Sequence, residues 1–166
     1  MTMAETKFKG SPIHTAGELP SVGATAPDFT LVKTDLSERK LSSYSGKKIL
    51  NIFPSVDTPV CARSVRTFHE RAEKLPGVTV LNISADLPFA HTRFCASEGI
   101  SNAEGLSTFR GDFGQKYGVT LVDGPLAGLL ARSVLVLDEQ NKVLHVELVP
   151  EIAQEPDYDA ALAKVQ

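Results

Sequence analysis

Two cysteines are the residues of this chain whose type and position could support covalent chemistry. Cys61 and Cys95 are the only cysteines among 166 residues. Two are too few for a secreted disulfide scaffold, and too few by themselves for a structural zinc site. In a reducing cytoplasm such a pair consists either of two buried thiols or of a redox couple, and the count leaves both possibilities open.

Cys61 lies in the first turn of a helix that the sequence predicts over residues 59–75. Thr58 suits the N-cap and Pro59 the first helical position. Free amide groups and the positive end of the helix dipole stabilise a thiolate there, and a thiolate is the nucleophilic form of cysteine. Apolar residues at helical spacing also place Cys61 at the edge of the buried face, so a packed core thiol remains the alternative interpretation. This stripe comprises Cys61, Val65, Phe68, Ala72 and Leu75.

The elements that must position Cys61 follow the order of an α/β fold. A hairpin is expected around the turn at residues 10–12. Helical crossovers between parallel strands, followed by a late hairpin, predict a thioredoxin-like fold, in which helices flank a central mixed sheet and an N-terminal β-hairpin is added. The expected strands cover residues 28–32, 48–53, 78–85, 133–137 and 144–149, and the expected helices cover 59–75, 88–98, 109–117 and 156–165.

Composition predicts one domain over residues 1–166, because 42% of the residues are apolar and 22% are charged. The formal net charge is −3 without a basic stripe, so nucleic acid is not an expected partner. No apolar run approaches the roughly 18 residues of a membrane span, and the N-terminus lacks the apolar region of a signal peptide. We therefore expect a cytoplasmic protein. No cofactor or metal is expected, since His91 and Cys95, four residues apart, are too few ligands for zinc.

The segment NIFPSVDTPVC, residues 51–61, resembles the active-site stretch of peroxiredoxins. That pattern is a proline, three residues, a threonine, two residues and a cysteine, and Pro54, Thr58 and Cys61 fit it without a gap. Further segments look like those of one branch, the bacterial thiol peroxidases of the atypical two-cysteine type. They are residues 84–90 (SADLPFA), 93–95 (RFC), 106–110 (LSTFR), 124–126 (GPL), 131–134 (ARSV) and 155–158 (EPDY).

The resemblance implies a homodimer that reduces hydrogen peroxide and organic hydroperoxides in antioxidant defence. It assigns Cys61 as the peroxidatic cysteine and Cys95 as the resolving one, joined after oxidation by a Cys61–Cys95 disulfide that thioredoxin reduces. Thr58 and Arg132 are expected to complete the surroundings of the reacting atoms, and Pro54 to shield them.

These residues suit attack on a peroxide. The thiolate would attack the terminal oxygen and become a sulfenic acid while negative charge moves to the leaving oxygen. Arg132 could supply a fixed charge and N–H groups to that oxygen, and Thr58 a hydroxyl, unless capping the helix engages it. A disulfide needs Cα atoms within about 7 Å, so we expect the Cys61 turn, the Cys95 segment or both to unfold locally. An apolar mouth that favours alkyl substrates is hypothesised from Phe89, Phe94 or Leu121.

Three other functions use the same residues. A thiol–disulfide oxidoreductase needs a second cysteine separated from the first by two residues, but Ser64 occupies that position relative to Cys61. A cysteine–histidine hydrolase needs a base beside the thiolate, for which His69 and His91 are the candidates. A binding domain with two inert core thiols predicts only slow, unselective oxidation.

Overall fold

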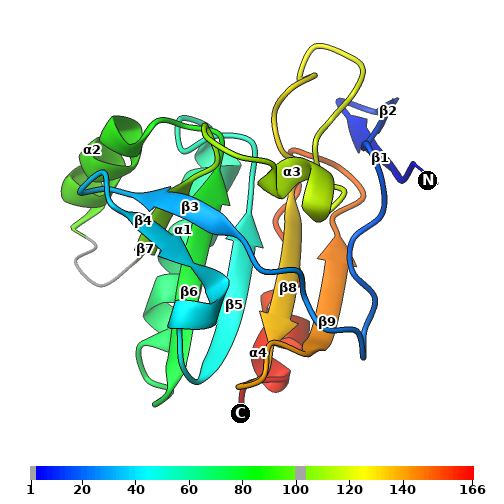
Figure 1. Cartoon of the computed structure of the whole chain (residues 1–166). Helices are drawn as coiled ribbons and strands as arrows, with labels where there is room; N and C mark the ends of the chain where they lie inside the picture. The colour runs from blue at the N-terminus through cyan, green and yellow to red at the C-terminus, as the bar shows by residue number, and fades with distance from the viewer. Residues whose placement is uncertain (1–2, 100–103) are drawn as a thin grey trace.

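A seven-stranded mixed sheet forms the centre of the computed structural model, which describes residues 3–99 and 104–166 (Figure 1). The strand order is β4-β3-β7-β6-β5-β8-β9. Strands β5, β6 and β7 run parallel, and β8 pairs antiparallel with β5. The predicted mixed sheet is confirmed. Its strands are β3 (Thr30–Lys33), β4 (Glu38–Lys40), β5 (Lys47–Ile52), β6 (Val78–Ser84), β7 (Glu104–Ser107), β8 (Ser133–Leu137) and β9 (Val143–Leu148).

Helices cover both faces of this sheet. Figure 1 shows α1 and α4 behind the sheet and α3 in front of it. Phe68 of α1 and Leu162 of α4 pack in one apolar cluster on the first face, and Phe113 of α3 belongs to a second cluster on the other face. Over the residues described, no helix is long and apolar enough to cross a bilayer. The helical segments are α1 (Pro59–Ala72), α2 (Pro88–Glu98), α3 (Phe113–Lys116), α4 (Tyr158–Ala163) and the 3₁₀ turn η1 (Leu41–Ser43).

The predicted N-terminal hairpin is confirmed, with strands β1 (Glu5–Phe8) and β2 (Ser11–His14). Its two turn residues, Lys9 and Gly10, have φ values of 52° and 82°. Paired positive φ values match the right-handed twist of the flanking strands. The hairpin lies apart from the central sheet, beside the loop that precedes β8 (Figure 1). Ile13 anchors it in a small apolar cluster with Leu121, Ala131 and Ile152.

Three elements of the structure, β4, β7 and α3, depart most from the prediction. Strands β4 and β7 were not predicted, because β4 is the wholly polar segment ERK and β7, with sequence EGLS, contains a glycine. Gly105 of β7 is required by packing, since a Cβ there would lie 2.9 Å from Nδ1 of His91. The predicted helix over 109–117 is shorter, because Gly111 has a φ of 91° and α3 begins only at Phe113.

Candidate active site

The pairing of β5 with β8 brings Arg132 to the start of α1. Ile52 is opposite Ser133 in the antiparallel register, so Arg132 lies level with the loop that leaves β5. That loop contains Pro54 and Thr58 and leads directly into α1. Cys61 is 0% exposed and Arg132 is 2% exposed. Two groups 71 positions apart in the sequence therefore meet in a buried site at one end of the sheet.

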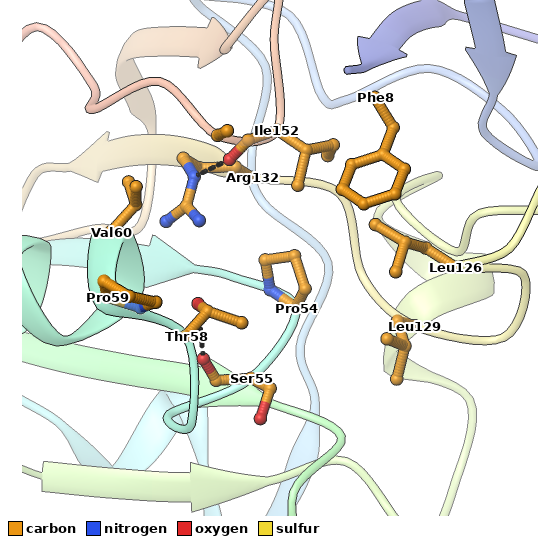
Figure 2. Close-up of a pocket in the computed structure, with 11 residues that line it drawn as sticks. Phe8, Pro54, Ser55, Thr58, Pro59, Val60, Leu126, Leu129, Arg132 and Ile152 are labelled. Carbon is orange, nitrogen blue, oxygen red and sulfur yellow. Dashed lines mark hydrogen bonds between the residues drawn. The ribbon is translucent and has the colours of Figure 1, made fainter. Parts of the chain in front are cut away.

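Arg132 contacts the sulfur of Cys61 directly. Its Nη2 donates to Cys61 Sγ at 3.1 Å, and its Nε donates to the carbonyl of Ile152 at 2.6 Å (Figure 2). The guanidinium is planar and permanently charged, so the Nε bond also fixes the direction of both terminal nitrogens. Nη1 is buried and has no hydrogen-bond partner within the described part of the chain. The site thus combines a cation against the sulfur with an unused N–H donor beside it.

Thr58 is the N-cap of α1, but its side chain does not cap the helix. Its hydroxyl donates to the carbonyl of Ser55 at 3.1 Å instead (Figure 2). The sequence left open whether capping engages this hydroxyl, and in the structure it makes no capping hydrogen bond. The hydroxyl oxygen keeps its lone pairs free to accept a hydrogen bond.

A pocket of about 200 Å³ opens beside this group, with Arg132 and Thr58 in its wall. Figure 2 shows Phe8 of the hairpin and Leu126 from the loop before β8 on one side, and Pro54 nearer the guanidinium. Cys61 is not part of the wall, so its sulfur lies one hydrogen-bond length behind Arg132. The remaining lining residues are Ser55, Pro59, Val60, Leu129, Ile152 and Ala153.

The mouth hypothesised from Phe89, Phe94 or Leu121 is wrong, because none of these residues lines the pocket. Phe89 is 67% exposed on α2, and Phe94 packs in the apolar cluster of Cys61. Leu121 is buried with Ile13 beneath the hairpin. The apolar wall comes instead from segments that are distant in sequence, which local patterns do not bring together.

Cys95 borders the same apolar cluster as Cys61, from the opposite helix. Phe53, Val65 and Phe94 belong to this cluster, which lies between the first half of α1 and α2. Both thiols are free. Cys95 is half-buried, and this burial raises the pKa of its thiol. The structure therefore brings the two cysteines to one cluster but gives the cationic partner to Cys61.

Polar contacts that the sequence did not reveal tie the two cysteine segments together. Asp57, before α1, forms an ion pair with Arg93 of α2 at 2.6 Å, and Arg66 of α1 forms another with Glu98. Asp86, which precedes α2, accepts the backbone N–H of Val56 at 2.9 Å. These contacts hold the loop before Cys61 against the helix that carries Cys95.

The histidines and Ser64 do not form the arrangements that two of the alternative functions need. His91 is buried, which lowers its pKa, and its Nε2 contacts Ser84 Oγ at 3.0 Å. His69 pairs with Glu73 further along α1. Among the residues described, no histidine is hydrogen-bonded to Cys61, as a cysteine–histidine hydrolase would require. Ser64 donates to the Cys61 carbonyl at 2.8 Å and cannot supply a second thiol.

Comparisons with known proteins agree with this geometry. The Redoxin family matches residues 21–162. Thiol peroxidases of Mycobacterium tuberculosis and Corynebacterium glutamicum are 57% and 56% identical over 162 residues, covering 97% of this chain and 98% of each relative. A crystal structure of a peroxiredoxin-like protein from Aquifex aeolicus is 40% identical with a TM-score of 0.92, covering 99% of this chain and 98% of that one. A thiol peroxidase from Chromobacterium violaceum is 25% identical with a TM-score of 0.91, covering 98% and 96%.

The chain belongs to the Redoxin family and, within it, to the thiol peroxidases of the peroxiredoxins. The predicted family and the thioredoxin-like fold are confirmed.

Proposed function

We propose that this protein is a thiol-dependent peroxidase that reduces hydrogen peroxide and organic hydroperoxides through Cys61. One observation carries the proposal: Arg132 Nη2 lies 3.1 Å from the Cys61 sulfur in the first turn of α1. A buried cation and a helix N-terminus together favour the thiolate, which is the form that attacks. An inert core thiol has no need of a buried arginine. The activity named for the relatives supports the same function.

The reaction transfers one oxygen atom to sulfur. The Cys61 thiolate attacks the terminal oxygen of the hydroperoxide, an S–O bond forms and the O–O bond breaks. Two electrons pass from sulfur to the peroxide, Cys61 becomes a sulfenic acid, and the alkoxide or hydroxide leaves and takes up a proton. The free N–H of Arg132 Nη1 stabilises the charge on the leaving oxygen. Thr58 Oγ accepts from the peroxide hydrogen, and Pro54 excludes water.

The pocket supports organic hydroperoxides as substrates. Its lining is mostly apolar, and Phe8, Leu126 and Leu129 lie on the side away from the guanidinium (Figure 2). An alkyl or aryl group there would bury apolar surface while its peroxide end reaches Arg132. Hydrogen peroxide needs only the polar end of the pocket.

Cys95 completes the cycle as the resolving cysteine. Its thiol attacks the Cys61 sulfenic acid, water leaves, and an intramolecular Cys61–Cys95 disulfide forms. The ion pairs and the apolar cluster between α1 and α2 must open locally for the two sulfurs to bond. A dithiol protein of the thioredoxin type then reduces the disulfide by exchange and restores both thiols. This cycle requires a reducing compartment, which supports a cytoplasmic role in antioxidant defence.

An exposed apolar surface supports the homodimer. Leu87, Phe89 and Phe109 are all exposed, and they follow the neighbouring ends of β6 and β7. Exposed large apolar groups at one edge are typical of association surfaces. Sedimentation that gives a dimer for the wild type and a monomer for Phe89→Ser would support this assembly, and a wild-type monomer would exclude it.

The function is tested by intact mass after a single oxidation. The fully reduced protein receives one equivalent of cumene hydroperoxide, and its mass is recorded within seconds beside that of Cys61→Ser. We expect the wild type to lose two hydrogens and the variant to remain unchanged. Cys61→Ser is nearly isosteric, so a loss of reaction reports the thiolate rather than misfolding.

The other outcomes separate the parts of the proposal. Gain of one oxygen by the wild type would retain the peroxidase and remove the resolving role of Cys95. No rapid change in either protein would contradict the function and leave two packed thiols. Thioredoxin is tested separately: it should restore both thiols of the oxidised protein, and failure to do so would require another reductant.

A further inference from the structure

A carboxylate in the loop after β9, that of Glu151, holds the turn of the N-terminal hairpin through both of its oxygens. Glu151 accepts the backbone N–H of Lys9 at 2.8 Å through Oε1 and that of Gly10 at 3.2 Å through Oε2. Both amides belong to the hairpin turn, where both residues have positive φ. Successive amides in such a turn form a concave site for an anion, and each carboxylate oxygen here takes one of them.

The residue after Glu151 links this attachment to the arginine of the site. The N–H of Ile152 donates to the Lys7 carbonyl of the hairpin at 2.8 Å. The carbonyl of Ile152 accepts from Arg132 Nε at 2.6 Å (Figure 2). A continuous path of hydrogen bonds therefore runs from the hairpin through Ile152 to Arg132, and from Arg132 to Cys61.

This path includes the hydrogen bond that orients the Arg132 guanidinium, from Nε to the Ile152 carbonyl. The guanidinium is planar, so a shift of the Ile152 carbonyl would turn Nη1 and Nη2 together. Nη2 would then move away from the Cys61 sulfur, and Nη1 would move away from the position of the leaving oxygen. Ile152 is also an apolar neighbour of Ile13 beneath the hairpin, so the loop can follow the hairpin if their attachment loosens.

We propose that Glu151 is a positioning residue for the peroxidase reaction: it docks the N-terminal hairpin so that the Ile152 carbonyl holds Arg132 against Cys61. The hairpin is thereby part of the active site, although it lies outside the central sheet. This inference rests on the proposed function of Cys61 and Arg132.

The hairpin offers a matched control at its other end. Asp123 accepts the His14 N–H at 2.8 Å and contacts the His14 ring at 2.7 Å. It therefore also holds β2 by a carboxylate, but no hydrogen bond links it to Arg132 or Ile152. Glu151→Gln and Asp123→Asn each replace one carboxylate by an amide of similar size on the same hairpin.

The test measures single-turnover oxidation of Cys61 by hydrogen peroxide, which needs no apolar wall and so reports the polar end of the site. We expect Glu151→Gln to slow the reaction about tenfold, as a small misplacement of a catalytic group does. We expect Asp123→Asn to remain within about twofold of the wild type. The pH profile of the reaction should move to higher pH in Glu151→Gln, and not in Asp123→Asn, because the cation no longer favours the thiolate.

A double-mutant cycle with Arg132→Gln separates positioning from a general loss of structure. If Glu151 acts through Arg132, Glu151→Gln should have no further effect in the Arg132→Gln background. An equal effect in both backgrounds, or equal effects of Glu151→Gln and Asp123→Asn, would overturn the inference while leaving the peroxidase intact. A wild-type protein that does not react with peroxide would overturn the proposed function and the inference with it.

Discussion

The two cysteines of this protein occupy the same apolar cluster and yet have opposite chemical surroundings. Cys61 lies in the first turn of α1, fully buried, with a guanidinium nitrogen 3.1 Å from its sulfur. Cys95 lies late in α2, half-buried, without a charged partner among the described residues, and burial raises its pKa. Burial alone favours the neutral thiol, and only a helix N-terminus or a cation reverses that preference.

The difference teaches that position in the fold, and not residue type alone, sets the chemical surroundings of a cysteine. In the proposed cycle Cys61 attacks first, because it is the cysteine with the cationic partner. In the same proposed cycle Cys95 acts afterwards on an electrophilic sulfenic acid, so its attack would be limited by access as well as by its thiolate fraction. One apolar cluster could therefore contain both the attacking and the resolving cysteine, because their different surroundings would fix which of them reacts first.

Removal of the Cys95 thiol should have the largest effect on turnover. Cys95→Ser should still oxidise once at Cys61, since Arg132 and the pocket are unchanged, but should form no intramolecular disulfide. Intact mass should show the gain of one oxygen, followed by further oxidation under excess peroxide. Steady turnover with thioredoxin should fall to background. A Cys95→Ser variant that turns over at the wild-type rate would falsify the resolving role.

Removal of the Arg132 cation should leave Cys61, like Cys95, without a charged partner among the described residues and should slow its oxidation. Arg132→Gln takes away the charge at the sulfur and a donor for the leaving oxygen, and we expect Cys61 oxidation to slow about 100-fold. Stopped-flow measurement with hydrogen peroxide gives the rate. Arg63→Gln is the control, because Arg63 is an exposed arginine of the same helix that pairs with Glu155. Similar rates for Arg132→Gln and the wild type would mean that the contact is structural.

Acidification should destabilise α2, which carries Cys95, before it destabilises α1, which carries Cys61. Burial lowers the pKa of His91 on α2 from its ordinary value of 6.5, against the opposing charge of Asp86. Below pH 6.5 an unfolded α2 takes up a proton that the folded helix does not, so its stability falls as pH drops towards the folded pKa. Opening of α2 should rise by at most about tenfold per pH unit. Hydrogen exchange of α2 measures this effect, and a His91→Gln variant that shows the same pH dependence would exclude His91 as its cause.

Removal of one ion pair between the loop before α1 and helix α2 should have the smallest effect, on the rate of disulfide formation. Asp57→Asn removes an exposed ion pair with Arg93, worth up to about 1 kcal/mol, or roughly fivefold in an equilibrium. Disulfide formation from the sulfenic acid should therefore accelerate by about two- to fivefold. Rapid-quench mass measurements follow this step. Asp159→Asn is the control, because it breaks a comparable pair with Arg71 at the far end of α1; an equal acceleration there would show that the tie is not specific.

The sequence by itself determined most of the secondary structure and the place of Cys61 in the first turn of a helix. The apolar stripe of α1, the proline at its start and the Gly-containing hairpin turn are local patterns, and each formed where local patterns predicted. The Pro54–Thr58–Cys61 spacing indicated the family for the same reason, since these residues lie in one loop and one helical turn. Strand β7 was not predicted from the sequence, because its glycine is required by a contact with His91, which is a tertiary requirement.

Only the tertiary structure decided how the site is completed. Arg132 reaches Cys61 because β5 and β8 pair in a particular register, and nothing near Arg132 in the sequence specifies that contact. The pocket wall joins Phe8 to Leu126, and the Glu151 attachment joins the hairpin to the loop after β9. Local sequence fixes periodicity and turns over a few residues, whereas a site of this kind is set by the side chains that distant strands and loops bring together.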